Sequence, residues 1–107
     1  MTPSEKDELL ITQLILMFQT AALQQMGKLK DPLTDTIAPD LAQAQISIDI
    51  LDVLHRKMAP NLSGMEARLF TNVLQDLRLN YVDEAAKSGD AHSQGKRSDS
   101  GPDESAP

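Results

Sequence analysis

The chain has 107 residues, of which 40% are hydrophobic and only 3% aromatic, and it contains neither cysteine nor tryptophan. This length allows one domain, and the lack of cysteine excludes disulfides, thiolate metal sites and a cysteine nucleophile. Acidic residues outnumber basic ones by 16 to 10, which gives a formal net charge of −6, and the basic residues are scattered. Nucleic-acid binders neutralise phosphates with a clustered basic surface, so we expect no nucleic-acid partner.

The first predicted helix covers residues 3–26 and begins at a capping box, with Thr2 as the cap, Pro3 at the first helical position and Glu5 at the third. Gly27 can adopt the left-handed conformation that ends a helix. Steps of about 100° per residue place two apolar groups on this helix. One is a narrow line of Leu9, Leu16 and Leu23, spaced by seven. The other is a broad arc, formed by Leu10, Ile11, Leu14, Ile15, Met17, Phe18, Ala21, Ala22 and Met26.

The same helix has an uncharged stretch between Glu8 and Lys28, which approaches the roughly 20 residues that span a bilayer. Threonine and glutamine side chains interrupt it at regular intervals, and each would need a hydrogen-bonding partner inside lipid. The acidic start of the chain is also unlike the basic start of a signal peptide. We therefore expect a buried or interfacial helix of a soluble protein with no membrane partner.

The second predicted helix follows a loop that contains Pro32 and Pro39. Asp40 and Gln43 predict a second capping box, and the helix should end near Met58 because Pro60 cannot continue it. Its predicted solvent-exposed face carries Gln45, Asp49, Asp52 and Arg56. Its apolar arc comprises Leu41, Ala44, Ile46, Ile48, Ile50, Leu51, Val53, Leu54 and Met58.

The third predicted helix follows a hairpin turn at Asn61 and Leu62 and begins at a capping box of Ser63 and Glu66. Leu79 and Val82 lie outside its apolar stripe, a second sign of apolar surface beyond what one domain buries. The stripe itself has helical spacing and is formed by Leu69, Phe70, Val73, Leu74, Leu77 and Tyr81.

The composition changes near Lys87, after which no large apolar residue follows. Such a segment cannot offset the entropy of ordering it. The sequence therefore predicts an all-α fold: a three-helix domain over residues 1–86, in which a C-terminal helical hairpin packs on the long N-terminal helix. A disordered tail over residues 87–107 follows it.

Asp49, Asp52 and His55 form the one acid and histidine cluster that we considered as a metal or acid–base site. Asp49 points about 120° away from His55 on a helix, and no third convergent ligand is evident. We interpret His55 as an edge-of-core or interface residue and expect no metal or other cofactor. Asp52 and Arg56 are four residues apart and should form a surface ion pair. No serine or threonine has a basic partner at a recognisable spacing, so we predict no catalytic residues.

Arg78 and Tyr81 lie one helical turn apart at the border of the apolar stripe. They could contact a ligand, with Arg78 binding an anion and Tyr81 a hydroxyl partner. They could equally be structural, with the ring of Tyr81 buried and the stem of Arg78 lying over it. We favour the structural interpretation and keep a small-molecule-binding or enzymatic domain with a pocket here as the alternative function.

Four segments have a characteristic order and spacing: Ala22-Leu23 with Gly27 and Pro32, Ile48–Lys57, Asn61-Leu62-Ser63 with Glu66, and Leu77–Val82. Together they resemble a known family, the domain of unknown function numbered eighteen forty-four, over roughly residues 8–84. The resemblance implies a bacterial cytoplasmic protein with three helices, and it implies no reaction because none is assigned to the family. Family members carry Lys-Thr-Lys-Gly-Asn-Leu before the third helix, whereas here Met58-Ala59-Pro60 replaces the Thr-Lys-Gly portion.

The leading functional hypothesis is a non-catalytic interaction module. A helix that is apolar on nearly all sides must be surrounded, and two further helices of a small domain leave the line of Leu9, Leu16 and Leu23 uncovered. We therefore expect a homo-oligomer that associates through this line, with another, unidentified protein as a further possible partner.

Overall fold

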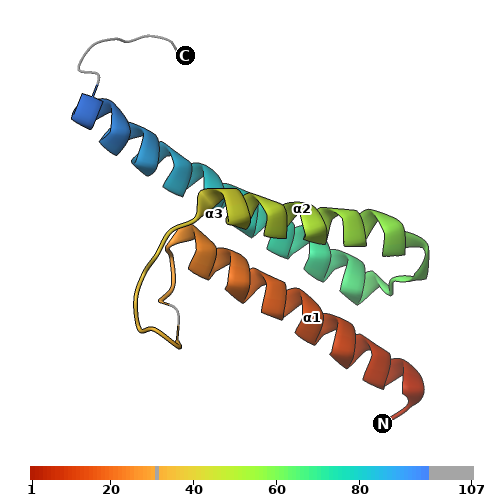
Figure 1. Ribbon diagram of the computed structural model, residues 1–107. Helices are drawn as coiled ribbons and strands as arrows, with labels where there is room; N and C mark the ends of the chain where they lie inside the picture. The colour runs from red at the N-terminus through yellow and green to blue at the C-terminus, as the bar shows by residue number, and fades with distance from the viewer. Residues whose placement is uncertain (31, 97–107) are drawn as a thin grey trace.

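The computed structural model describes residues 1–30 and 32–96, except for the side chains of residues 88–96. Its helices are α1 (Pro3–Met26), α2 (Leu41–Met58) and α3 (Gly64–Lys96), with a short 3-10 helix η1 (Ala59–Asn61) between α2 and α3. Each of the three α-helices contacts the other two (Figure 1). The expected all-α, three-helix architecture is confirmed.

The first and third helices begin at the predicted capping boxes. The Thr2 hydroxyl accepts a hydrogen bond from the Glu5 N–H at 3.1 Å, and the Glu5 carboxylate accepts one from the Thr2 N–H at 2.8 Å. Ser63 and Glu66 repeat this arrangement at 3.1 Å and 2.8 Å. Both boxes satisfy N–H groups that the first turn of a helix leaves without a partner.

The box predicted at the start of α2 is only half formed. The Asp40 carboxylate accepts a hydrogen bond from the Gln43 N–H at 3.0 Å, as expected. The Asp40 N–H, however, donates to the carbonyl oxygen of Gln25 at 2.6 Å instead of to the Gln43 side chain. The prediction of a complete box was wrong because this donor is used to attach the end of the loop to the last turn of α1.

The ends of α1 and α2 lie where the sequence places them. Gly27 ends α1 in the left-handed conformation, with φ of 90°. Its N–H donates to the carbonyl of Gln24, and the next N–H, that of Lys28, donates to the carbonyl of Leu23. At the other end of the domain, η1 directly follows the last residue of α2 and contains Pro60.

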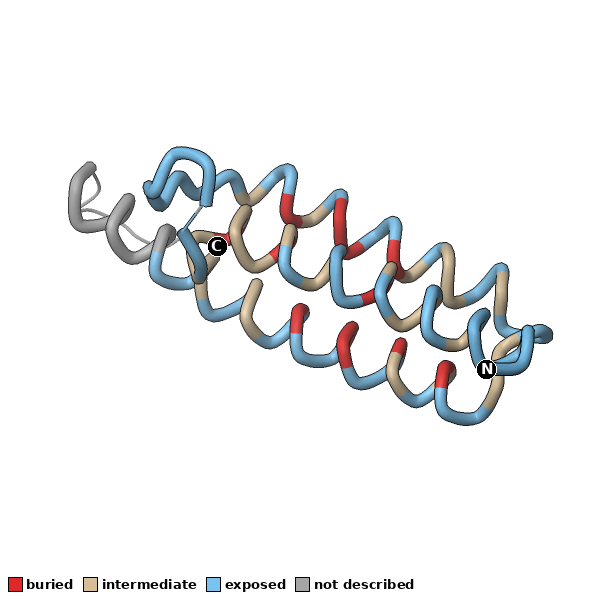
Figure 2. Tube along the Cα trace, turned by 90° about the horizontal axis from the view of Figure 1, so that it is seen from below, coloured by how far each residue is buried: buried red, intermediate tan, exposed pale blue. Residues whose placement is uncertain are grey.

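The core lies where the three helices face one another (Figure 2). The partly buried Leu69 and Tyr81 pack against it, so the whole predicted stripe of α3 faces inward as expected. The buried apolar side chains of the described residues are Ile15, Ala22 and Met26 of α1, Ala44, Ile48 and Leu51 of α2, and Phe70, Val73, Leu74 and Leu77 of α3.

The buried face of α1 is narrower than the predicted arc. Leu10 and Met17, which the prediction placed in that arc, are 52% and 61% exposed. The buried face is centred near Ile15, and Met17 is two residues, or about 200° of helical rotation, away from it. In α2, likewise, Ile46, Ile50 and Val53 belong to the predicted arc but are exposed. Two neighbouring helices cover only one side of each helix, so the prediction of broad buried arcs was wrong at these positions.

Helix α3 continues past the expected end of the domain at residue 86. It has 33 residues against 24 in α1, and at 1.5 Å per residue it is about 50 Å long against about 36 Å. Its C-terminal part, blue in Figure 1, extends beyond α1 and α2. Elongating an existing helix adds one hydrogen bond for each residue fixed, and the next proline is Pro102. Residues 87–96, assigned to the tail, are therefore helical in backbone, and the rest of the predicted disordered tail lies outside the described residues.

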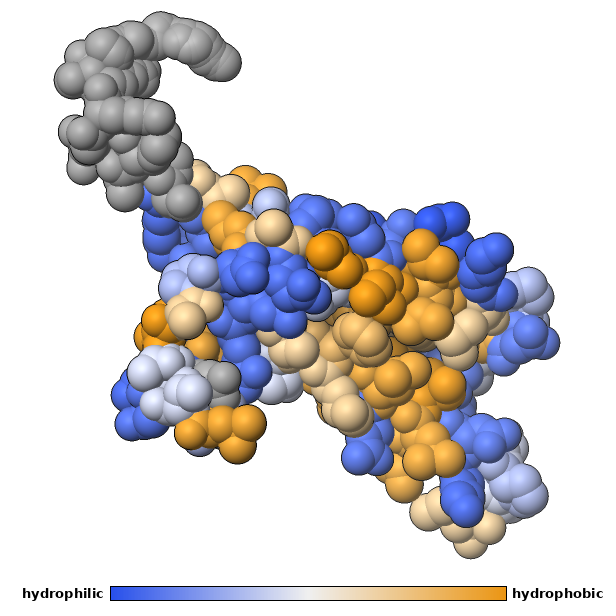
Figure 3. All heavy atoms as spheres, in the orientation of Figure 1, coloured by the Kyte–Doolittle hydropathy of each residue, from blue (hydrophilic) through white to orange (hydrophobic). Residues whose placement is uncertain are grey.

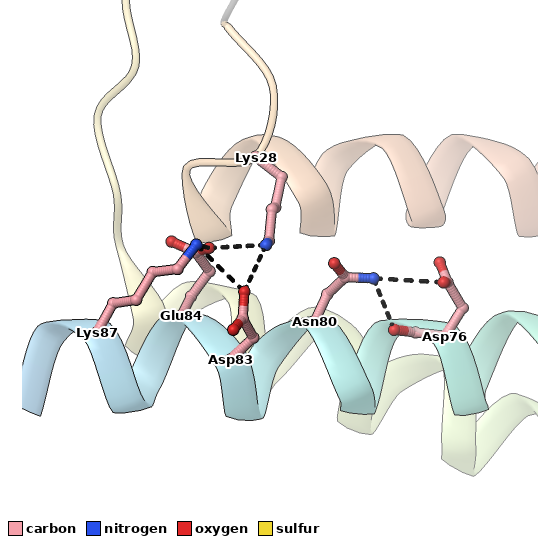
Figure 4. Close-up of polar contacts among 6 residues, drawn as sticks. All are labelled: Lys28, Asp76, Asn80, Asp83, Glu84 and Lys87. Atoms are coloured by element: carbon pink, nitrogen blue, oxygen red, sulfur yellow. Dashed lines mark hydrogen bonds and ion pairs between the residues drawn. The ribbon is translucent and has the colours of Figure 1, made fainter.

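A cluster of charged side chains ties the end of α1 to α3 (Figure 4). The ammonium group of Lys28 lies 2.8 Å from both the Asp83 and the Glu84 carboxylates, and Lys87 contacts the same two acids at 3.2 and 3.1 Å. Hydrogen bonds from Lys28, and then from Lys87, lower the pKa of both acids. The cluster therefore favours the ionised form of both carboxylates.

Candidate interaction surface

The side of α1 that faces away from α2 and α3 carries an exposed apolar surface. Leu9, Leu10, Leu16 and Met17 are 54%, 52%, 43% and 61% exposed. Gln13 and Thr20 lie among them and are also exposed. We call these six residues the α1 outer face. Most of them line a shallow, open hollow whose lining residues all belong to α1, so no other element of the described chain covers it.

The predicted line of Leu9, Leu16 and Leu23 is brought to the surface only in part. Leu9 and Leu16 are exposed, whereas Leu23 packs against the core. Leu10 and Met17 are exposed instead, and they form a second pair, also seven residues apart, directly beside the first. That spacing is visible in the sequence, but the sequence does not show which side of an all-round apolar helix turns outward.

The α1 outer face lies in a long uncharged stretch, because no residue from Leu9 to Gly27 is acidic or basic. By length and composition alone α1 could cross a membrane, a test that the core helices of soluble proteins and signal sequences also pass. Only 17% of its most apolar stretch is buried inside the domain. Part of the apolar surface of α1 is therefore not used by the intramolecular core.

Exposed apolar side chains also occur on α2, where Ile46, Ile50 and Val53 are 49%, 39% and 40% exposed. Figure 3 shows hydrophobic side chains gathered over both α1 and α2 on one side of the molecule. The loop between α1 and α2 does not cover this surface: Ile37 and Pro39 lie instead against Gly27, at the far end of α1. An open apolar surface thus extends beyond one helix.

The acid and histidine cluster considered as a metal site is not assembled. The Asp49 carboxylate accepts a hydrogen bond from the Gln45 amide at 2.9 Å. The His55 ring is half-buried and stacks on Phe70, with ring centroids 5.2 Å apart and an interplanar angle of 9°, so its interpretation as an edge-of-core residue is confirmed. No three His, Cys, Asp or Glu side chains within the described parts of the chain are placed to hold a metal ion.

Asp52, the third member of that cluster, binds two arginines. It pairs with Arg56 at 3.2 Å, the predicted surface pair, and with Arg78 of α3 at 3.1 Å. These contacts, Arg56 first, lower the pKa of the Asp52 carboxyl. The guanidinium group of Arg78 is therefore already paired with a carboxylate of the neighbouring helix, which it shares with Arg56.

The hollow beside Arg78 does not include Tyr81. This shallow hollow lies between α2 and α3 and is lined by Arg78, Leu79 and Val82. Tyr81 is partly buried and packs against the core, as the structural interpretation predicted. The guanidinium group of Arg78 bridges α3 to α2 through Asp52, and the contact of its stem with the Tyr81 ring stays a prediction.

Comparison with known proteins gives one match. No curated protein and no solved structure matches the chain. The family model described as "Domain of unknown function (DUF1844)" matches residues 8–83, a range that includes the α1 outer face, both loops and the packed part of α3. Because this match covers most of the sequence, the chain belongs to the DUF1844 family, for which no function is assigned.

Proposed function

We propose that this protein is a non-catalytic helical module that associates through the α1 outer face. The observation that carries the proposal is the set of four large apolar side chains, each 43% or more exposed, on one side of an uncharged stretch of helix. Full burial of a leucine or methionine contributes about 1.5–3 kcal/mol, so half-exposed side chains leave a substantial part of that gain unused. Contiguous exposed apolar surfaces of this kind mark interaction sites.

The titratable groups of the packed helices support a structural rather than a catalytic interpretation. Asp52 pairs with two arginines, Glu66 caps α3, and Asp83 and Glu84 bind Lys28. Each of these carboxylates already has partners that favour its ionised form or fix its position. A general acid or base would need a pKa near the working pH, and the pKa values of Asp52, Asp83 and Glu84 are shifted downward, away from it.

The proposal predicts that the protein is a dimer or small oligomer at micromolar concentration, as measured by size-exclusion chromatography with light scattering. Leu16→Glu should dissociate it, because the change places a charge in an apolar contact. The circular dichroism spectrum should stay helical, since Leu16 points away from the core. Leu79→Glu is the matched control, because Leu79 is 67% exposed on α3 and outside the α1 outer face. A monomeric wild type, or equal dissociation by both variants, would contradict the proposal.

A further inference from the structure

The exposed apolar residues of the α1 outer face are arranged symmetrically about one polar residue. The four apolar residues lie in pairs at equal distances from Gln13: Leu10 and Leu16 are three residues away on either side, and Leu9 and Met17 are four. Residues three and four apart are neighbours on one side of a helix. All four therefore surround the Gln13 side chain, which is itself exposed.

This symmetry is what a two-fold axis through Gln13 requires. In an antiparallel pair of α1 helices related by such an axis, residue i of one copy lies opposite residue 26 − i of the other. Leu9 would then lie opposite the second copy's Met17, and Leu10 opposite its Leu16. Every exposed apolar residue of the face would thus be covered by another apolar residue.

The polar residues of the face fit the same arrangement. Gln13 would lie opposite its own copy, and because a glutamine amide has both donor and acceptor atoms, the two amides can hydrogen-bond reciprocally. A single polar residue in an otherwise apolar helix contact fixes the register of the two helices. Lys6 and Thr20, each seven residues from Gln13, would also meet, placing an ammonium donor beside a hydroxyl acceptor.

A parallel pair with the same face would be less favourable. It would place Lys6 against the second copy's Lys6, and the acidic residues Glu5, Asp7 and Glu8 of the two copies close together. Like charges at such positions repel. An antiparallel pair avoids this repulsion and also places the positive end of one helix dipole beside the negative end of the other.

A lipid surface is the competing occupant, and the face fits it less well. Helices that lie in a membrane interface carry lysine and arginine on the polar side and aromatic or leucine residues on the apolar side. The α1 outer face instead has an amide at its centre and no aromatic residue, and the net charge of −6 opposes binding to anionic lipids.

We infer that the occupant of the α1 outer face is a second copy of this chain, packed antiparallel about a two-fold axis at Gln13. This inference rests on the proposed function and adds the orientation and register of the contact. It predicts which pairs of positions are close: residue 13 to itself, and residue 9 to residue 17, whereas two copies of residue 9 are offset by about 12 Å along the helix axis.

Disulfide trapping tests this geometry, since the chain contains no cysteine of its own and a disulfide requires Cα atoms within about 7 Å. Under mild oxidation, Gln13→Cys should form a covalent dimer. Leu9→Cys and Met17→Cys should each form little covalent dimer alone. When the two variants are mixed, they should form a covalent heterodimer, which also tests the register with Gln13 intact. Asn72→Cys, exposed on α3, is the control for random collision and should not crosslink.

The outcomes separate the inference from the proposed function. If Leu9→Cys crosslinks to itself as efficiently as the mixture does, the helices are parallel: association would stand, and the antiparallel inference would be overturned. If light scattering shows a dimer but none of the α1 cysteines crosslinks above the Asn72→Cys control, the contact uses another surface. A wild type that is monomeric by light scattering would overturn both, and sedimentation of this monomer with phosphatidylcholine vesicles would identify a lipid surface as the occupant.

Discussion

Gly27 occupies a position where the fold narrowly restricts the type of residue. Its φ of 90° lies in the left-handed region, which ends α1 and turns the chain into the loop. The space for a side chain is also occupied: a Cβ atom at this position would lie 2.9 Å from Cγ of Pro39. Backbone conformation and close packing therefore both favour glycine here.

Gly27→Ala is consequently expected to lower the free energy of unfolding by more than about 1 kcal/mol, since a non-glycine residue in the left-handed region alone costs about 1–2 kcal/mol. Urea denaturation measures the change. Gly64→Ala is the matched control, because Gly64 has no positive φ and its Cβ would meet only the flexible end of Arg68, at 3.4 Å. A similar loss in both variants would show that the left-handed turn is not the cause.

At the scale of the element, the beginnings and ends of the helices could be predicted because they are decided locally. Ser63 and Glu66 are three residues apart, and no distant residue is needed to form their two hydrogen bonds. The same holds for Thr2 and Glu5. Asp40 shows the limit of this reasoning, because its N–H found a partner in Gln25 of a different helix.

The cap at Ser63 gives a prediction for α3. Ser63→Ala should lower the free energy of unfolding by about 1 kcal/mol, the usual cost of removing an N-cap side chain, as measured by thermal or urea denaturation. Thr2→Ala removes an equivalent cap at the exposed start of α1, where the first turn can fray without disturbing the core. It should cost clearly less. Equal losses in the two variants would mean that the stability contributed by a cap does not depend on its place in the packed hairpin.

The orientation of α1 could not be predicted to the same extent. Apolar residues occupy nearly its whole circumference, so periodicity alone left Leu10, Met17 and Leu23 on the wrong sides. The surface formed by α2 and α3 decides which residues of α1 are buried, and that surface forms only as the chain folds. Leu9 and Leu16 were recognised because they lie outside the predicted arc and are exposed.

At the scale of the whole molecule, the cluster of Lys28, Asp83, Glu84 and Lys87 predicts how stability depends on pH. Asp83 and Glu84 have ordinary pKa values of 3.8 and 4.5, and the folded state lowers both. A depressed carboxyl pKa contributes stability above the unfolded-state value and loses it as pH falls through the folded-state value. The contribution of the cluster should therefore be complete at neutral pH and disappear progressively below about pH 4.5.

The measurement is urea denaturation at a series of pH values from neutral to acidic. The wild type should lose stability over this range more steeply than Lys28→Met, because without the Lys28 ammonium group the two carboxyls are shifted less. Lys30→Met is the matched control, since Lys30 makes only a 3.8 Å pair with the exposed Asp35. Its curve should follow that of the wild type. Parallel curves for wild type and Lys28→Met would rule out a role for the cluster in the pH dependence.

The placement of Tyr81 has a spectroscopic consequence. It is the chain's one tyrosine, and there is no tryptophan, so the tyrosine fluorescence of the protein arises from a single ring. This ring lies partly buried against the core, near the end of the packed part of α3. Its emission and its near-ultraviolet circular dichroism therefore report the packing of that end of the bundle. Comparison with far-ultraviolet ellipticity, which follows the backbone of all three helices, would reveal whether this end loosens before the rest unfolds.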